Sequence, residues 1–320
     1  MADHPATLRP LPGPAMAVVM PVYNAAATLA ATIASVAAQD CADFELIAID
    51  DGSRDDSLAL LHRLAADDPR IRVLARANGG VSSARNLGVA AATAPLIAFL
   101  DADDLWDPGK LSAHLALHRA RPALVASYAR IAFIAADATA IAGARTHSSL
   151  APDPLGLLAV LGENPVCTAS NFVVRRDAFV ACGGFDEQLG FAEDQEVVAR
   201  LIARGGMIAG IDAVLTGYRL SVMGLSMDLD RMHHGWREVV ARHLPDPRAR
   251  ARLEALYYRY LARRALRSGG RPGLALRYVV QGLRSDARGF LEQPRRSLAT
   301  IAAALVAPLL PTTLRLRLFA

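Results

Sequence analysis

The first hundred residues alternate short apolar runs with longer alanine-rich stretches, and this alternation constrains the fold more than any other feature. The apolar runs predict strands, and the stretches between them have the composition and length of helices. Strands that alternate with such helices form βαβ units, whose strands lie parallel in one sheet. The predicted strands lie at 15–23, 44–50, 71–75 and 95–100. We therefore predict an α/β fold with a mostly parallel central sheet flanked by helices.

The pattern becomes less regular from about residue 123. Residues 123–144 read as two strands and a turn, and residues 164–187 as a strand, a short helix and a glycine turn. A helix follows and ends at Gly205. Amphipathic helices rich in Arg, Leu and Tyr begin near residue 225. We predict three parts: a flexible leader at 1–15, an α/β domain at 16–225 and a basic helical tail at 226–320.

Acidic residues follow the strand that ends at Leu100. Since ligands bind beyond the carboxyl ends of parallel strands, Asp101 and Asp103 are candidates for binding Mg²⁺ or Mn²⁺. A bound cation would offset the repulsion between such crowded carboxylates. The alternative is that an acid here caps the helix that begins near Pro108, and for Asp104 and Asp107 we favour that interpretation.

Two adjacent acids also end the second predicted strand, in the sequence IDDGSRDDS. One of them could accept a hydrogen bond from a ribose hydroxyl or a base, and the other could hold the loop together. An Asx turn with helix capping by Asp55 explains Ser53 to Asp56 equally well. It does not explain two acids directly at the end of the strand.

These motifs, in this order and spacing, resemble family 2 glycosyltransferases, an inverting family with the GT-A fold. The resemblance rests on VVMPVYN, IAIDDGS, GGVSSARN, PLIAFLDADD and the later GGFDEQLGFAEDQE, and it extends from Val18 to Arg219. It implies a nucleotide-binding site made by Pro21, Val22, Tyr23, Asp51, Gly80, Ala84, Arg85, Asn86 and Asp101. It further implies Asp103 as the direct metal ligand with Asp101 in support, Asp194 as the general base with Glu193 beside it, and Arg219 as a diphosphate contact.

The residue types suit an inverting transfer, in which one base removes the proton of the acceptor hydroxyl. The alternative for Glu193 and Asp194 is favourable charge at a helix N-terminus. Two departures from the family pattern concern the acceptor side. Gln195 stands where the family commonly has a bulky aromatic residue, and no histidine follows Arg219 in RLSVMGLS.

The charge of the chain is unevenly distributed. Residues 231–320 hold 18 arginines and 5 acidic residues, a net charge of +13, whereas residues 1–230 carry −9. We expect the tail to lie on an anionic membrane surface. The alternative is that it packs on the α/β domain and covers its own leucines. No nucleic-acid-binding module is recognisable, so no such partner is expected. Cys41, Cys167 and Cys182 fit no zinc or redox spacing, which is typical of a reducing, cytoplasmic compartment.

The sequence thus predicts a metal-dependent inverting glycosyltransferase. The donor would be a nucleotide-diphosphate sugar, in the first place a UDP-sugar, and the acceptor a glycan or lipid-linked hydroxyl in cell-envelope polysaccharide synthesis. Two alternatives stay open: a nucleotidyltransferase, although PVYNAAATLA lacks the glycines and basic residues of a triphosphate loop, and a non-catalytic sugar-nucleotide scaffold on the membrane.

Overall fold

The computed structural model of the protein describes residues 13–144, 146–220, 228–267, 273–311, 314, 315 and 318. Most of the predicted leader and the predicted boundary near residue 225 therefore lie outside the described residues. The strands are β1 Met16–Val22, β2 Phe44–Asp50, β3 Ile71–Ala75, β4 Leu96–Phe99, β5 Leu105–Trp106, β6 Leu124–Ile134, β7 Thr146–His147, β8 Val173–Arg175 and β9 Met207–Arg219. The helices are α1 Ala26–Ala37, α2 Ser57–Asp67, α3 Val81–Ala91, α4 Lys110–Ala120, α5 Leu157–Glu163, α6 Arg176–Cys182, α7 Glu193–Ala203, α8 Leu229–His243, α9 Pro247–Arg267, α10 Leu274–Phe290 and α11 Pro294–Val306, with 3-10 turns at Ala169–Asn171 and Ala307–Leu309.

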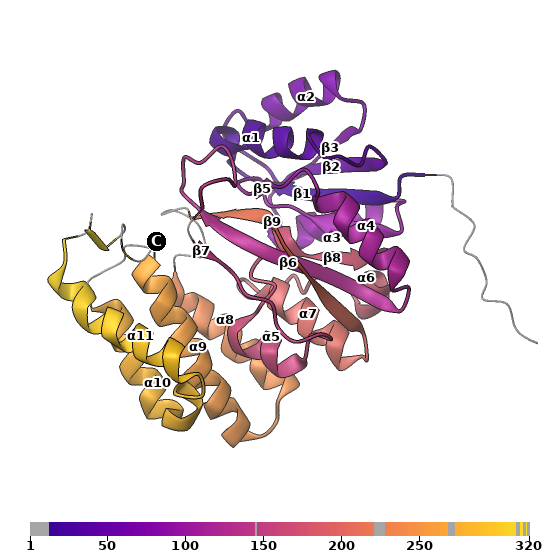
Figure 1. Ribbon diagram of the computed structural model, residues 1–320. Helices are drawn as coiled ribbons and strands as arrows, with labels where there is room; N and C mark the ends of the chain where they lie inside the picture. Colours follow the sequence, from indigo (N-terminus) through magenta and orange to yellow (C-terminus); the bar gives the residue numbers. More distant parts are fainter. Residues whose placement is uncertain are drawn as a thin grey trace, which may run out of the picture.

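These strands form one mixed sheet in the order β3-β2-β1-β4-β8-β6-β9-β5, with β7 paired to β6 (Figure 1). β1 pairs in parallel with both β2 and β4, and β2 pairs in parallel with β3. β8 runs antiparallel to β4 and β6, while β6 and β9 are parallel. The predicted α/β fold is confirmed, and the carboxyl ends of β1, β2 and β4 meet at one edge of the sheet.

Helices cover both faces of this sheet, and every residue of β1 is buried as a result. The side chains of α1 and α4 pack on one face, and those of α3 and α7 pack on the other. Gly88 allows α3 to lie close to the sheet, because a Cβ atom there would stand 2.5 Å from Val19 Cγ1. This close packing fixes the N-terminal half of α3 beside the strand ends.

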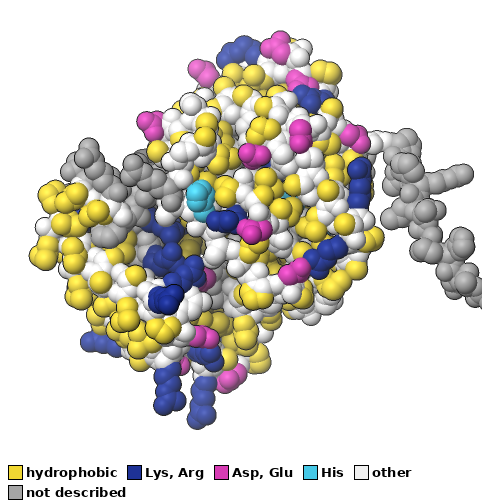
Figure 2. Space-filling view, in the orientation of Figure 1, with side chains coloured by type: hydrophobic (Ala, Val, Ile, Leu, Met, Phe, Trp, Pro, Cys, Tyr) yellow, Lys and Arg dark blue, Asp and Glu magenta, His cyan; other side chains and the backbone are white. Residues whose placement is uncertain are grey.

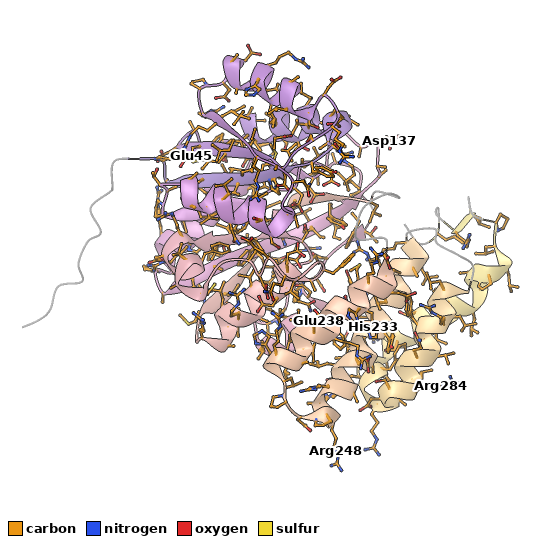
Figure 3. All side chains as sticks on the ribbon, turned by 180° about the vertical axis from the view of Figure 1, so that it is seen from behind. Glu45, Asp137, His233, Glu238, Arg248 and Arg284 are labelled. Carbon is orange, nitrogen blue, oxygen red and sulfur yellow. The ribbon has the colours of Figure 1, made fainter. Side chains whose placement is uncertain are left out.

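The C-terminal helices share the core of the α/β domain. The indole of Trp236 on α8 is buried and donates a hydrogen bond to Leu161 O at 2.6 Å. Arg259 on α9 is also buried and bonds Glu163 of α5 at 2.9 Å. Figure 3 shows these helices from behind, with His233 on α8. Helices α8 and α9 therefore pack on the α/β domain.

Helix α11 behaves differently from α8 and α9. Residues 297–314 contain no charged side chain and are interrupted by Pro308 and Pro311, and α11 ends at Val306, two residues before Pro308. Several leucines in this region are exposed. None of the helices in the described part of the chain is both long and apolar enough to cross a bilayer.

Candidate active site

The polar clusters predicted from the sequence lie together at the edge where β1, β2 and β4 end. At the end of β1, Pro21 and Val22 are buried, whereas Tyr23 is 48% exposed. Asp51 follows β2, and Asp101 follows the strand next to β1 on its other side. This edge therefore presents an exposed aromatic ring at the end of β1 and a carboxylate at the end of each neighbouring strand.

Asp51 holds the loop that leads into α3. Its two carboxylate oxygens accept hydrogen bonds from the backbone N–H groups of Gly79 (3.0 Å) and Gly80 (2.8 Å). Gly80 has a φ of +92°, a conformation that favours glycine. The neighbouring Asp50 accepts a bond from Ser53 N at 3.2 Å. Both acids of the DDGS motif therefore shape the loops on which a nucleotide would lie.

Arg85 joins two acids that are far apart in the sequence. Its Nη2 lies 2.6 Å from Asp101 Oδ1, and its Nη1 lies 2.8 Å from Glu193 Oε1. The guanidinium is buried and lies 5.2 Å from the centre of the Phe185 ring. Burial alone would lower the pKa of Arg85, but Asp101 and Glu193 outweigh it and hold that pKa above its usual value. Arg85 is thus a positive charge that compensates the crowded carboxylates.

Asp103 and Asp104 occupy different environments. Burial, and then the charge of Asp101, raise the pKa of Asp103 to about 6. Asp104 is buried, and its Oδ1 accepts a hydrogen bond from the backbone N–H of Arg219 at 2.9 Å. The favoured interpretation of Asp104 as a helix cap is therefore wrong. It ties the acid loop to the end of β9. Asp107 does accept a bond from Gly109 N at the start of α4.

The guanidinium of Arg219 donates hydrogen bonds to backbone carbonyl groups. Its Nε donates to Asp103 O at 2.6 Å, and its Nη1 donates to Ala136 O and Ala138 O. The side chain is buried in this arrangement. It lies next to the acid loop, so its predicted contact with a diphosphate stays a prediction. Of the residues that follow it in RLSVMGLS, only Leu220 is among the described residues.

Glu193 and Asp194 open α7, directly after Ala192 with a φ of +60°. Asp194 is partly buried, and its Oδ1 accepts a bond from Gln195 N at 2.6 Å. Burial, and then the charge of Glu193, raise the pKa of Asp194 to about 7. A helix N-terminus by itself would favour the ionised carboxylate and lower its pKa. The raised value suits a group that takes up a proton near neutral pH.

Two side chains singled out in the sequence, Asn86 and Gln195, form hydrogen bonds within the protein that hold neighbouring segments together. Asn86 was expected to line the nucleotide site, but its amide donates to Phe185 O (2.9 Å) and Glu187 Oε1 (3.0 Å) and accepts from Phe185 N. Gln195 is buried and donates to Val160 O at 2.6 Å, which links α7 to the residues of α5. The side chain of Ala84 packs in the core and is 0% exposed, so it offers no surface to a ligand.

A short polar segment that was not predicted from the sequence lies behind the acids. Ser170 Oγ accepts a bond from Asp101 N at 3.0 Å, and Ser170 O accepts one from Trp106 Nε1 at 2.9 Å. Thr168 Oγ1 lies 3.5 Å from Asp101 Oδ2. The only sequence signal is the run CTASN between apolar residues, which could equally belong to a turn.

Comparison with known proteins identifies the family. The family model described as "Glycosyl transferase family 2" matches residues 17–183. The succinoglycan biosynthesis protein ExoU from Rhizobium meliloti (strain 1021) is 33% identical over 244 residues, which cover 70% of this chain and 69% of ExoU. The chain belongs to glycosyl transferase family 2. The resemblance inferred from the motifs is confirmed, and this protein is a glycosyltransferase.

Solved structures agree with this glycosyltransferase in fold. The mannosyltransferase PcManGT from Pyrobaculum calidifontis, in complex with GDP-Man and Mn²⁺, superposes with a TM-score of 0.62 at 19% identity, covering 96% of this chain and 88% of that one. S. aureus TarS 1-349 in complex with UDP-GlcNAc gives a TM-score of 0.58 at 18% identity, covering 94% and 88%. The predicted GT-A fold is confirmed. Several other curated relatives are matched over only 21% to 30% of their own length.

The acids of this glycosyltransferase could hold a divalent cation only if waters and substrate oxygens supplied its other ligands. The described residues contain no group of three or more His, Cys, Asp or Glu side chains placed to hold a metal ion. Asp101 and Asp103 supply two carboxylates, and the buried Oδ2 of Asp104 has no hydrogen-bond partner in the described part of the chain. Mg²⁺ in proteins is commonly held by one or two carboxylates together with waters and substrate phosphates.

The bridge made by Arg85 leads to a prediction about stability. We expect Arg85→Met to lower the free energy of unfolding by about 3 kcal/mol, because it leaves the carboxylates of Asp101 and Glu193 uncompensated. Urea denaturation measures this change. The matched control is Arg72→Met, which breaks a surface pair with Glu45 at 2.9 Å (Glu45 is labelled in Figure 3) and should cost less than about 1 kcal/mol. An equally small effect of both variants would contradict the role of Arg85.

Proposed function

We propose that this glycosyltransferase is a metal-dependent inverting enzyme of cell-envelope polysaccharide synthesis. The donor is a nucleotide-diphosphate sugar, with UDP-sugars as the favoured class, and the acceptor is a hydroxyl of a glycan or lipid-linked sugar. The observation that carries the proposal is the double ion pair of Arg85, which brings Asp101 and Glu193 to one guanidinium. Asp103 and Asp194, the next acids along the chain, therefore flank a single site.

The donor side is assigned to the strand ends. Tyr23 offers an exposed ring to the base, and Pro21 and Val22 form the wall behind it. We assign to Asp51 a hydrogen bond from the base or ribose, since each carboxylate oxygen can accept more than one hydrogen bond. PcManGT was solved with GDP-Man and Mn²⁺, and TarS with UDP-GlcNAc. These complexes support a nucleotide-sugar donor for this chain.

In the proposed reaction Asp194 removes the proton of the acceptor hydroxyl as its oxygen attacks the anomeric carbon. The new bond from carbon to oxygen forms as the bond to the diphosphate oxygen breaks, and the nucleoside diphosphate leaves with the electron pair. Attack from the opposite face inverts the anomeric configuration. A cation bound at Asp103 would supply Lewis-acid stabilisation of the leaving diphosphate. Arg85 keeps Glu193 beside Asp194 and thereby helps to orient the acceptor.

The test is an assay of nucleoside diphosphate release from UDP-, GDP- and dTDP-sugars with Mn²⁺, with the anomeric configuration of the released or transferred sugar read by NMR. Turnover of one donor class with inversion supports the proposal. Turnover with retention contradicts the role of Asp194. Nucleotide binding without any turnover contradicts catalysis and favours a sugar-nucleotide scaffold.

We also propose that α11 is the part of the tail that contacts a membrane. The small and polar residues of α11 face inward, and its leucines face outward: Ser297, Thr300 and Ala304 are buried, whereas Leu298 and Leu305 are 61% and 54% exposed, and Leu309 of the following 3-10 turn is 82% exposed. The two exposed leucines of α11 lie at positions i and i+7, so they share one face of the helix, and the exposed Arg295 lies at i−3 on the same face.

The occupant proposed for this face is an anionic lipid surface on the cytoplasmic leaflet. A second copy of the chain fits less well, because so short a stripe buries far less than the roughly 800 Å² per partner of a standard interface. The surrounding segment is also strongly basic, so two copies would repel each other. Exposed leucines flanked by arginine match a lipid surface that is apolar inside and anionic outside.

For the membrane contact, Leu305→Asp/Leu309→Asp should lower binding to phosphatidylglycerol vesicles at least tenfold in a sedimentation assay. The control variant is Leu158→Asp/Val180→Asp. Leu158 on α5 is 59% exposed and Val180 on α6 is 57% exposed, and this variant should bind like the wild type. Equal loss in both variants, or a dimer that dissociates only in the α11 variant, would contradict the proposal.

A further inference from the structure

Arginines of α9 and α11 gather beside the catalytic domain. Figure 2 shows dark-blue side chains in the region between the C-terminal helices and the sheet. Glu163 takes both of the ion pairs that the described residues form here, from Arg259 at 2.9 Å and from Arg296 at 3.1 Å. Three further arginines of α9 lie in this group, which we call the α9 arginine cluster: Arg263, Arg264 and Arg267.

Aromatic rings line the α9 arginine cluster. Arg267 Cζ stands 4.6 Å from the centre of the Phe133 ring, and Arg264 Nη2 donates to Tyr218 Oη at 2.9 Å. The rings of Phe133 and Tyr218 meet edge to face, 6.1 Å apart. Tyr218 directly precedes Arg219, whose Nε bonds Asp103 O. The cluster is therefore linked, through the end of β9, to the loop that carries the strand-end acids.

The cluster and the proposed base share one electrostatic neighbour, Cys167. Burial raises the pKa of the Cys167 thiol to about 12; the charges of Arg264 and Arg267 oppose that rise, and the charge of Asp194 adds to it. Cys167 thus has the arginines and Asp194 as electrostatic neighbours. Thr168, the next residue, lies against Asp101. The α9 arginine cluster and Asp194 therefore both influence the charge environment of this loop.

Two arginines of the cluster carry a charge that no described acidic residue offsets through an ion pair. Arg263 and Arg267 are half-buried and form no ion pair with any described residue. Burial, and then the charges of Arg267 and Arg296, lower the pKa of Arg263 to about 10. Crowded, partly desolvated cations are unfavourable unless an anion joins them. Guanidinium groups match phosphate oxygens in geometry, and several cations together suit a multiply charged anion better than a single carboxylate.

We infer that the α9 arginine cluster is the binding site for a phosphoryl group carried by the acceptor. The inference rests on the proposed function, since it names the chemical class of the acceptor used by the same site. The phosphate or diphosphate would bind at Arg263 and Arg267, and the sugar hydroxyl would reach Asp194. The phosphoryl group could belong to a lipid carrier or to a water-soluble glycan, and both sources present the same oxygens to the arginines.

The test measures binding of inorganic pyrophosphate by calorimetry in metal-free buffer. We expect Arg263→Gln/Arg267→Gln to weaken binding at least tenfold. The control Arg248→Gln/Arg284→Gln removes the same charge from exposed positions, labelled in Figure 3, and should change binding less than twofold. Because the clustered cations repel each other, the cluster variant should melt at the same temperature as the wild type or higher. Equal losses in both variants, or a lower melting temperature of the cluster variant, would overturn the inference.

Binding of UDP with Mn²⁺ separates the acceptor from the donor. UDP affinity should stay within twofold in the cluster variant. If it fell as far as pyrophosphate affinity, the cluster would belong to the donor diphosphate and the inference would fail. Binding to vesicles that contain phosphatidic acid identifies the source of the phosphoryl group. Vesicle binding that depends on the cluster and that pyrophosphate displaces indicates a lipid carrier. Binding of pyrophosphate without binding of vesicles indicates a soluble glycan phosphate. Donor turnover in the wild type tests the proposed function independently of all these outcomes.

Discussion

Replacing Asp194 by Asn should lower kcat about 10³-fold and leave the affinity for the donor nucleotide unchanged. A positioned general base contributes on the order of 10² to 10⁴ in rate, and the amide of Asn cannot accept the proton of the acceptor hydroxyl. The pH profile gives a second measurement. Because the pKa of Asp194 is raised to about 7, the wild type should lose activity as the pH falls below about 7, where the carboxylate becomes protonated.

A control variant separates the loss of a base from the loss of a charge. Asp177 is an exposed acid near the start of α6 that pairs with Arg175, so Asp177→Asn should keep wild-type kcat and the same acidic limb. If Asp194→Asn retained more than a tenth of wild-type kcat, or if the acidic limb persisted in its residual activity, another group would have to be the base.

Replacing Asp103 by Asn should abolish the metal-dependent part of nucleotide binding and lower turnover by about 10³-fold. A divalent cation stabilises a leaving diphosphate by several kcal/mol, and each 1.36 kcal/mol corresponds to a tenfold change in rate. Thermal shift measures binding, with UDP, GDP, dTDP and CMP each tested with and without Mn²⁺. A hundredfold excess of ligand over Kd stabilises the folded protein by about 2.7 kcal/mol.

Asp107→Asn is the matched control for this experiment, because it lies in the same loop but accepts a hydrogen bond from Gly109 N at the start of α4. It should retain the metal-dependent shift. A wild type stabilised equally with and without Mn²⁺ would contradict a metal site at Asp103. One nucleotide that stabilises only with Mn²⁺ would name the donor class.

The strands and the acids at their ends could be predicted from the sequence, because both follow from local patterns. Apolar runs bounded by helices predict parallel strands, and parallel strands place Asp51, Asp101 and Asp103 at one edge. The GGFDE turn and the helix that carries Asp194 were likewise visible in their glycines and apolar spacing. These features depend on residues close together in the chain.

The contacts between distant segments could not be predicted in this way. Arg85 precedes Asp101 by 16 residues and Glu193 by 108, and nothing in a local pattern indicates that one guanidinium serves both. Asp104 has the sequence position of a helix cap, but its carboxylate accepts a hydrogen bond from the backbone N–H of Arg219 at the end of β9. The residue pattern of α11 predicts an amphipathic helix but does not say which of its faces is buried. Only the packing of α11 against its neighbours shows that its leucines face outward.

Trp236 and Arg259 also bear on how the protein unfolds and how it can change over evolution. Both side chains are buried against α5, so the last third of the chain completes a core that the first two thirds leave open. Such a shared core should melt in one cooperative transition instead of two. An exchange of tails between relatives would therefore have to carry the matching α5 surface with it.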